Sequence, residues 1–164
     1  MALPNTSQAV IHDTASEHDP DGVHIGDKQT AGHRLALIAR KNLYGEPDLV
    51  ASGPVFQSME IKDDGSVVIT FSDIGGGLKF KGMPEGTKTA TGEQIGFGIA
   101  GEDGQYVCAD EVTIDGATVT LRSAAVERPV SIRYAWSSNP VANLYNAEDL
   151  PANSFRAGET KDPE

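Results

Sequence analysis

Hydrophobic and polar residues alternate with a period of two along most of the chain after residue 50. Turn-forming residues interrupt this alternation about every ten positions, which is typical of short antiparallel strands. The pattern therefore predicts a mainly β fold, with an antiparallel β-sandwich over residues 49–157. In the first strand of this region, strict alternation places four side chains on the core face: Val55, Gln57, Met59 and Ile61.

Turn signals within this region predict three hairpins, at residues 63–66, 102–104 and 115–116. The strongest is the Asp115-Gly116 pair between two alternating runs, which predicts a type I′ turn because both central residues of that turn need positive φ angles. Three consecutive glycines at residues 75–77 precede a strand rather than a helix. They predict a bend or bulge, not a loop that holds phosphate.

The first 48 residues follow a different pattern. Residues 8–11 predict a short strand, and a polar loop follows it as far as residue 22. A helix is expected from the capping residue Asp27 to Leu43, with apolar side chains at helical spacing and Gly45 and Pro47 after its end. A strand, a loop and an amphipathic helix are typical of one unit of an α/β domain. We expect residues 1–48 to be the remnant of such a domain and residues 158–164 to be a disordered tail.

The charge of the chain narrows its possible partners. Thirteen basic and 24 acidic residues give a formal net charge of −11, which repels a phosphate backbone, so we expect no nucleic-acid partner. No stretch approaches the length of a membrane span, so we expect no membrane partner, and residues 1–5 lack the features of a signal peptide. The single cysteine, Cys108, stands in a strand-like run and is expected to be an inert core thiol.

An acid precedes a histidine by three residues just ahead of the predicted helix, as Asp21 and His24. In a serine hydrolase a carboxylate orients the imidazole, and the imidazole takes the proton of the nucleophile. One loop can supply both groups at this spacing. The same pattern also fits a solvated loop histidine, because Asp-x-x-His is short enough to occur by chance.

Two other groups of residues could carry chemistry. The imidazole and carboxylate side chains of His12, Asp13, His18, Asp19 and His24 could gather a metal, but their spacing matches no helical ligand pair and we expect none. Four aromatic residues could stack on a sugar, although packing in the core is the favoured interpretation: Tyr134, Trp136, Tyr145 and Phe155.

Two arginines are further candidates for ligand binding. Arg133 and Arg156 could pair with the carboxylate of a sugar. Glu127, Glu148 and Asp149 could equally serve as their partners within the chain. The sequence leaves these alternatives open.

Several longer runs carry a resemblance to a known family. They are DGVH at residues 21–24, GPVFQSM at 53–59, GIAGEDG at 98–104, VSIRYAW at 130–136 and NPVANLYN at 139–146. Together they resemble the C-terminal part of the sialate O-acetylesterases, which are SGNH-type esterases that remove acetyl groups from sugars. The resemblance covers nearly the whole chain, and it identifies residues 1–48 with the end of the SGNH α/β catalytic domain.

The resemblance implies roles for the loop residues. His24 would be the general base and Asp21 its orienting acid, with Asp19 as the competitor for that second role. The family's nucleophilic serine, in a Gly-x-Ser context, and its oxyanion residues belong to blocks that do not occur in this sequence. No cofactor or metal is implied, and family members are often secreted or periplasmic, although the compartment of this chain stays unknown.

We therefore expect a C-terminal fragment or subunit of a carbohydrate O-acetylesterase of the sialate 9-O-acetylesterase type. Its expected partners are an acetylated carbohydrate and either a Ser-bearing catalytic half or a second copy of the chain. The alternative is a non-catalytic β-sandwich module that binds carbohydrate or protein.

Overall fold

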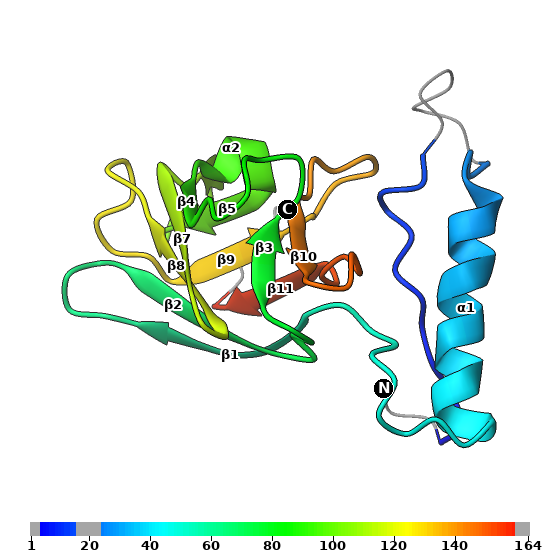
Figure 1. Cartoon of the computed structure of the whole chain (residues 1–164). Helices are drawn as coiled ribbons and strands as arrows, with labels where there is room; N and C mark the ends of the chain where they lie inside the picture. The colour runs from blue at the N-terminus through cyan, green and yellow to red at the C-terminus, as the bar shows by residue number, and fades with distance from the viewer. Residues whose placement is uncertain (1–3, 16–23, 160–164) are drawn as a thin grey trace.

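Antiparallel strands make up most of the computed structural model, which describes residues 4–15 and 24–159 (Figure 1). One sheet has the order β1-β2-β8-β7-β4 and comprises Val55–Ile61, Val67–Ser72, Thr118–Arg122, Glu111–Asp115 and Thr89–Ala90. A second has the order β11-β9-β5-β6 and comprises Phe155–Gly158, Ser131–Tyr134, Phe97–Ala100 and Val107–Cys108. The mainly β, antiparallel expectation is confirmed.

Shorter elements complete the fold. Strand β3 (Leu78–Phe80) pairs with β10 (Leu144–Asn146), and the short helix α2 (Gly92–Ile95) precedes β5. The long helix α1 (Lys28–Leu43) stands to one side of the strands (Figure 1). Among the described residues, neither helix has the length and apolar character needed to cross a membrane.

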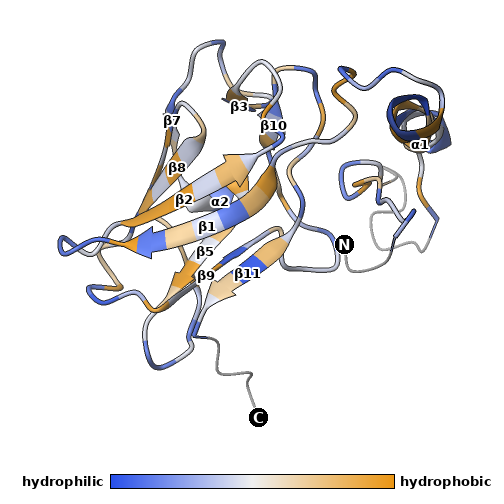
Figure 2. Ribbon diagram, turned by 90° about the horizontal axis from the view of Figure 1, so that it is seen from below, coloured by the Kyte–Doolittle hydropathy of each residue, from blue (hydrophilic) through white to orange (hydrophobic). Residues whose placement is uncertain are grey.

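The core lies between the two larger sheets (Figure 2). Alternate residues of β2 point inward, so that Val67, Ile69 and Phe71 are buried. On the other sheet, Phe97 and Tyr134 pack with ring centroids 4.6 Å apart. The Tyr134 hydroxyl accepts the backbone N–H of Leu144 at 3.1 Å, so the polar end of this fully buried ring is paired. Tyr134, Tyr145 and Phe155 are all buried, as their assignment to the core requires.

The predicted hairpin at residues 115–116 forms, but its turn type is different. Asp115 pairs with Thr118, so the two turn residues are Gly116 and Ala117. Of these only Gly116 has a positive φ angle, 56°, which is the pattern of a type II′ turn. The observed register pairs Ile114 with Val119 and, two residues further along, Val112 with Leu121. A turn at 115–116 would instead set Ile114 opposite Ala117, so cross-strand packing decides the register.

The expected alternation in β1 is wrong at one position. A bulge between Phe56 and Ser58 shifts the register against β2 and reverses the faces of the strand. Phe56 consequently packs on the core and stacks on Phe155 with ring centroids 4.7 Å apart, whereas Gln57 is exposed. Met59 keeps its predicted contact with the core, but Ile61 is 43% exposed.

The glycine triplet forms the predicted bend and also makes a close contact. The backbone N–H of Gly76 donates to both carboxylate oxygens of Glu148, at 3.0 and 3.2 Å. Gly75 has a φ angle of 53°, and a Cβ atom there would lie 1.9 Å from a Glu148 oxygen. Glycine is therefore favoured at this position by its positive φ angle, whereas the flexible Glu148 side chain could move away from a Cβ atom.

Helix α1 begins as the sequence predicts. The Asp27 side chain accepts the backbone N–H of Thr30 at 2.9 Å, which is a typical N-cap. The strand expected at residues 8–11 does not form. Instead, the carbonyl of Val10 accepts a hydrogen bond from Arg34 of α1 at 2.7 Å, so this segment bonds to a side chain rather than to a sheet edge.

An ion pair joins this N-terminal segment to α1, and hydrogen bonds join the segment to the β-sandwich. Both terminal nitrogens of Arg34 donate to the Asp13 carboxylate, at 2.5 and 2.7 Å, and the two side chains are only 6% and 17% exposed. The Tyr145 hydroxyl, from β10, donates to the same carboxylate at 2.8 Å. Nearby, His12 Nε2 donates to the carbonyl of Ala152 at 3.1 Å. We call the Asp13, Arg34 and Tyr145 cluster the tether.

The tether lowers the pKa of Asp13. Burial by itself raises the pKa of this carboxyl, but the hydrogen bonds from Arg34 and Tyr145 and the charge of Arg34 outweigh it. Burial also raises the pKa of Tyr145, which keeps its hydroxyl protonated as a donor.

The last strand of the sandwich is followed by one described residue, Glu159. Strand β11 ends at Gly158, and the N–H of Glu159 donates to the carbonyl of Val130 at 3.0 Å. The rest of the expected tail, residues 160–164, falls outside the described residues. Division of the chain at residues 48 and 157 into separate domains remains an expectation.

We predict that Asp13→Asn destabilises the fold by about 1–3 kcal/mol at neutral pH, because Arg34 would lose its charged partner. Since the folded pKa of Asp13 is below its unfolded value of about 3.9, this contribution is complete above that pH and disappears as pH falls through the folded pKa. Urea unfolding of both proteins across this range measures the difference.

The matched control is Glu46→Gln, which breaks the exposed ion pair between Glu46 and Arg40. We expect no measurable loss of stability from that variant. A wild-type chain no more stable than Asp13→Asn at neutral pH would contradict the role of the tether.

Candidate functional site

His24 lies in the turn that leads into α1. The carbonyl of Thr14 accepts the N–H groups of Gly26 and Asp27, at 2.9 and 3.2 Å, and so ties this turn to the N-terminal segment. The side chain of His24 is exposed, and no hydrogen bond joins it to another residue in the described ranges. Its imidazole is therefore not held by any residue of the described ranges.

The predicted acids of the site cannot be placed. Asp21, its competitor Asp19 and the alternative metal ligand His18 all lie outside the described residues. The pairing of an acid with His24 therefore stays a prediction.

The alternative metal ligands His12 and Asp13 have other contacts. His12 Nε2 donates to a backbone carbonyl, and Asp13 is held by Arg34 and Tyr145. The second ring nitrogen of His12, Nδ1, is buried without a partner in the part of the chain that the structure describes. Within those residues, no three His, Cys, Asp or Glu side chains gather in a way that could hold a metal ion.

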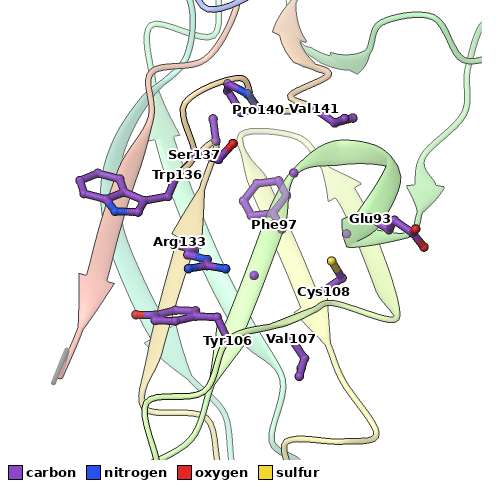
Figure 3. A pocket seen from close by; sticks show the side chains of 14 residues that line it. Glu93, Phe97, Tyr106, Val107, Cys108, Arg133, Trp136, Ser137, Pro140 and Val141 are labelled. Atoms are coloured by element: carbon purple, nitrogen blue, oxygen red, sulfur yellow. The ribbon is translucent and has the colours of Figure 1, made fainter. Parts of the chain in front are cut away.

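A hollow on the outer face of the second sheet is the other candidate site (Figure 3). Strands β5, β6 and β9, helix α2 and the loop that follows β9 line it. Across the sheet, Arg156 of β11, Arg133 of β9, Gly98 of β5 and Cys108 of β6 are neighbours in one row of cross-strand pairs. The row alternates with buried residues of the core, so it faces away from the first sheet.

Two arginines of this face lie against aromatic rings. The guanidinium of Arg133 lies 4.4 Å from the centre of the Tyr106 ring, and that of Arg156 lies 5.1 Å from the centre of Trp136. Tyr106 is held in place because its hydroxyl donates to Ser131 Oγ at 3.0 Å. A Cβ atom on Gly98 would lie 3.1 Å from Arg133 Nε, so the glycine leaves room for this stack.

Two of the three internal acids suggested as partners of the arginines, Glu148 and Asp149, have other contacts. Glu148 accepts the N–H of Gly76, and Asp149 pairs with Lys79 at 2.8 Å. The guanidinium of Arg133 forms no ion pair with any carboxylate of the described residues.

Trp136 differs from the other three aromatic candidates because it is 49% exposed. The residue before it, Ala135, has a φ angle of 51°, in the left-handed region that residues other than glycine rarely adopt. The N–H of Ala135 donates to the carbonyl of Gly96 at 3.0 Å, which holds the chain in this conformation where β9 ends.

The expectation that Cys108 is an inert core thiol is wrong, because the residue is exposed. Strand β6 has two residues and pairs only with β5, at the edge of the sheet, and both of its side chains are exposed. The core position in this run belongs to the next residue, Ala109, which is 1% exposed.

Sequence reasoning did not find Tyr106 or Gly98 as parts of this hollow. A glycine inside the strand run FGIA was an available signal, because strand glycines often mark a close approach of other groups. The cross-strand register that sets Gly98 beside Arg133 could not be obtained from that signal.

Comparisons with known proteins identify relatives among esterases, although no family model matches the chain. The sialate O-acetylesterase of Mus musculus is 29% identical over 166 residues, covering 94% of this chain and 28% of that protein. The Homo sapiens protein of the same name is 42% identical over 60 residues, covering 36% of this chain and 12% of its own length. The chain therefore spans less than a third of each of these relatives.

A solved structure agrees with these relatives. The carbohydrate acetylesterase from Xanthomonas citri is 42% identical, with a TM-score of 0.72, over 83% of this chain and 29% of that one. Both the sequence and the fold of the chain are thus similar to the C-terminal part of a sialate O-acetylesterase or related carbohydrate acetylesterase.

Proposed function

We propose that the chain is a portion of, or a complementing subunit for, a carbohydrate O-acetylesterase, and that His24 is its general base. The observation that carries the proposal is the 42% identity with the Xanthomonas citri carbohydrate acetylesterase over 83% of the chain. The remaining parts of the active site, a nucleophilic serine and oxyanion donors, would come from a Ser-bearing part.

The proposed reaction has two steps. His24 takes the proton of the serine while the serine oxygen attacks the acetyl carbonyl, and the protonated imidazole then donates this proton to the departing sugar oxygen. Water next attacks the acetyl-enzyme, His24 takes the water proton, and acetate leaves as the serine recovers its proton. Asp21 would hold the imidazole in the correct tautomer and stabilise its charged form.

The local structure around His24 supports this role. The base is exposed at the start of α1, where a nucleophile from another part of the enzyme can approach it. The turn is anchored to Thr14, and Arg34 of the same helix is anchored to Asp13 and Tyr145. The tether would therefore fix the position of the base relative to the β-sandwich.

Helix α1 also offers a surface for the Ser-bearing part. Leu35 and Leu43 are 58% and 77% exposed, and with Ile38 and Ala39 they line a groove beside residues 5–7. Only Ala31 and Arg34 of the helix are buried. An apolar face of this kind is covered in a stable assembly, and without the Ser-bearing part a second copy of the chain would cover it.

We predict that a chimera regains acetylesterase activity when this chain replaces the matched segment of the Xanthomonas citri enzyme. His24→Ala in the chimera should then lower kcat by about three orders of magnitude or more, because the proton acceptor is lost. Asp21→Asn should lower kcat by a similar factor, because the imidazole would then take the wrong tautomer, whereas Asp19→Asn should change kcat little. Rates of hydrolysis of p-nitrophenyl acetate and of an acetylated sugar measure both the regained activity and the effect of each substitution.

His33→Ala is the matched control, because His33 is exposed on α1 outside the turn. The chain alone should hydrolyse p-nitrophenyl acetate no faster than free imidazole does. An active chimera whose kcat is unchanged by His24→Ala would exclude His24 as the general base. Loss of activity in His12→Ala and His18→Ala as well as in His24→Ala would favour the metal alternative.

We also predict that the isolated chain self-associates through the groove on α1. Replacement of both Leu35 and Leu43 by Ser should yield a monomer, because it removes the two most exposed apolar side chains of the groove. Sedimentation velocity across a wide concentration range measures the oligomeric state. The control is Ala36→Ser, on the same helix outside the groove. A wild-type chain that stays monomeric at every concentration would rule out this association.

A further inference from the structure

We propose that the hydroxyl of Tyr145 is a positioning group for the esterase reaction. By holding Asp13, this side chain of β10 sets where the imidazole of His24 meets the serine. The inference rests on the proposed function of His24 and extends it, because it gives the β-sandwich a role in the reaction. Tyr145 does not touch the reacting atoms and acts through Asp13 and through the next residue, Thr14.

The connection between the two parts of the chain is narrow. Two hydrogen bonds connect residues 4–15 and 24–45, which stand to one side in Figure 1, to the described part of the sandwich, residues 54–159. His12 donates to the backbone carbonyl of Ala152, and the Tyr145 hydroxyl donates to Asp13 at 2.8 Å. No ion pair joins the same described ranges. Tyr145 therefore supplies the one hydrogen bond that a sandwich side chain makes to these residues.

Apolar packing adds little to this connection. Helix α1 buries only Ala31 and Arg34. A cavity of about 410 Å³ separates α1 and residues 6–8 from the start of the sandwich, and its lining includes Ile38, Val55 and Asp73. Close-packed side chains fix two elements relative to each other, whereas a cavity leaves them room to shift. The directional hydrogen bonds therefore determine how α1 lies on the sandwich.

One path from Asp13 to His24 runs along the backbone through Thr14. Thr14 is 2% exposed, and its N–H and its hydroxyl both donate to the backbone carbonyl three residues earlier, at 3.0 and 2.7 Å. Its own carbonyl accepts the N–H groups of Gly26 and Asp27. Gly26 lies two residues after His24, so a shift of the segment that contains Asp13 moves the turn of the base with it.

The second path runs through helix α1. Both terminal nitrogens of Arg34 donate to the Asp13 carboxylate, and Arg34 lies about two helical turns after the capping residue Asp27. One carboxylate thus holds both the helix that follows His24 and the segment that anchors its turn. Loss of the Tyr145 hydroxyl leaves these contacts intact and frees them, as a unit, from the sandwich. The local structure around the base should therefore survive while its position changes.

The reaction is sensitive to where the base lies. Proton transfer needs the serine oxygen and the imidazole nitrogen within about 2.6–3.2 Å, and a misplacement of about 1 Å can lower the rate roughly a hundredfold. In this proposal the Ser-bearing part contacts the sandwich as well as α1, so the position of His24 relative to the sandwich is also its position relative to the serine. The similarity to the Xanthomonas citri enzyme covers 83% of the chain, more than the sandwich by itself, which supports a common arrangement of the two parts.

The kinetic experiment introduces Tyr145→Phe into the chimera, which keeps the ring and removes only the hydroxyl. We expect kcat to fall by about tenfold to a hundredfold with KM unchanged, because the substrate loses no contact while fewer molecules hold the base at the reacting distance. Tyr134→Phe is the matched control, since it removes another buried tyrosine hydroxyl, which bonds to Leu144 within the sandwich. Tyr134→Phe should lower the unfolding midpoint and leave kcat unchanged.

The outcomes separate this proposal from the proposed function. An inactive chimera, or one whose kcat is unchanged by His24→Ala, contradicts the proposed function and the positioning role with it. An active chimera that depends on His24 but has the same kcat with Tyr145→Phe contradicts the positioning role alone. An equal loss of kcat in Tyr145→Phe and Tyr134→Phe would assign the effect to lost stability and would also overturn the role of Tyr145.

A distance measurement tests the positioning without any activity. Nitroxide labels are attached to Cys108 on β6 and to a cysteine introduced by His33→Cys on α1, which are both exposed positions. Labelled chain is diluted in unlabelled chain, so that only pairs of labels within one molecule contribute. The distribution of distances from pulsed electron–electron double resonance should broaden about twofold or more in Tyr145→Phe, and broaden also in Asp13→Asn, but not in Tyr134→Phe. Equal widths in the unsubstituted chain and in Tyr145→Phe would refute the proposal.

Discussion

The Asp13 carboxylate joins the N-terminal part of the molecule to the sandwich, because it pairs with Arg34 of α1 and accepts the Tyr145 hydroxyl of β10. Helix α1 has 16 residues, of which two are buried, and one of these two is Arg34. Apolar packing therefore contributes little to the position of the helix. A partly buried charge needs a partner with good geometry, and Asp13 supplies it with a fork-to-fork contact that the Tyr145 hydroxyl completes. The turn that carries His24 takes its position from this arrangement.

Much of the fold could be predicted from the sequence because period-two alternation is a local signal. The signal fails where a contact between distant strands decides the outcome. The bulge in β1 brings Phe56 rather than Gln57 onto Phe155, and the pairing of Ile114 with Val119 determines the turn type. Residues 8–11 are as apolar as a strand, but the carbonyl of Val10 accepts a hydrogen bond from Arg34 of α1 instead of from a neighbouring strand.

The candidate sites also differ in whether local sequence signals or contacts between distant strands define them. His24 could be found from a short motif beside a helix cap, because both signals lie within seven residues of Asp21. The hollow could not, because Arg133, Gly98 and Cys108 become neighbours only through the register of three strands. Even the exposure of Cys108 follows from its place at a sheet edge, which an apolar run of residues does not reveal.

The tether also determines the order in which the chain can fold. Asp13 lies 132 residues before its partner Tyr145, and His12 lies 140 residues before Ala152. At a synthesis rate of roughly 5–20 residues per second, the N-terminal segment waits about 7–26 s on the ribosome before β10 is made. During this interval Asp13 and Arg34 can meet each other, but the helix they join has no sandwich to dock on. Docking of the proposed catalytic base is thus a late, long-range event of folding.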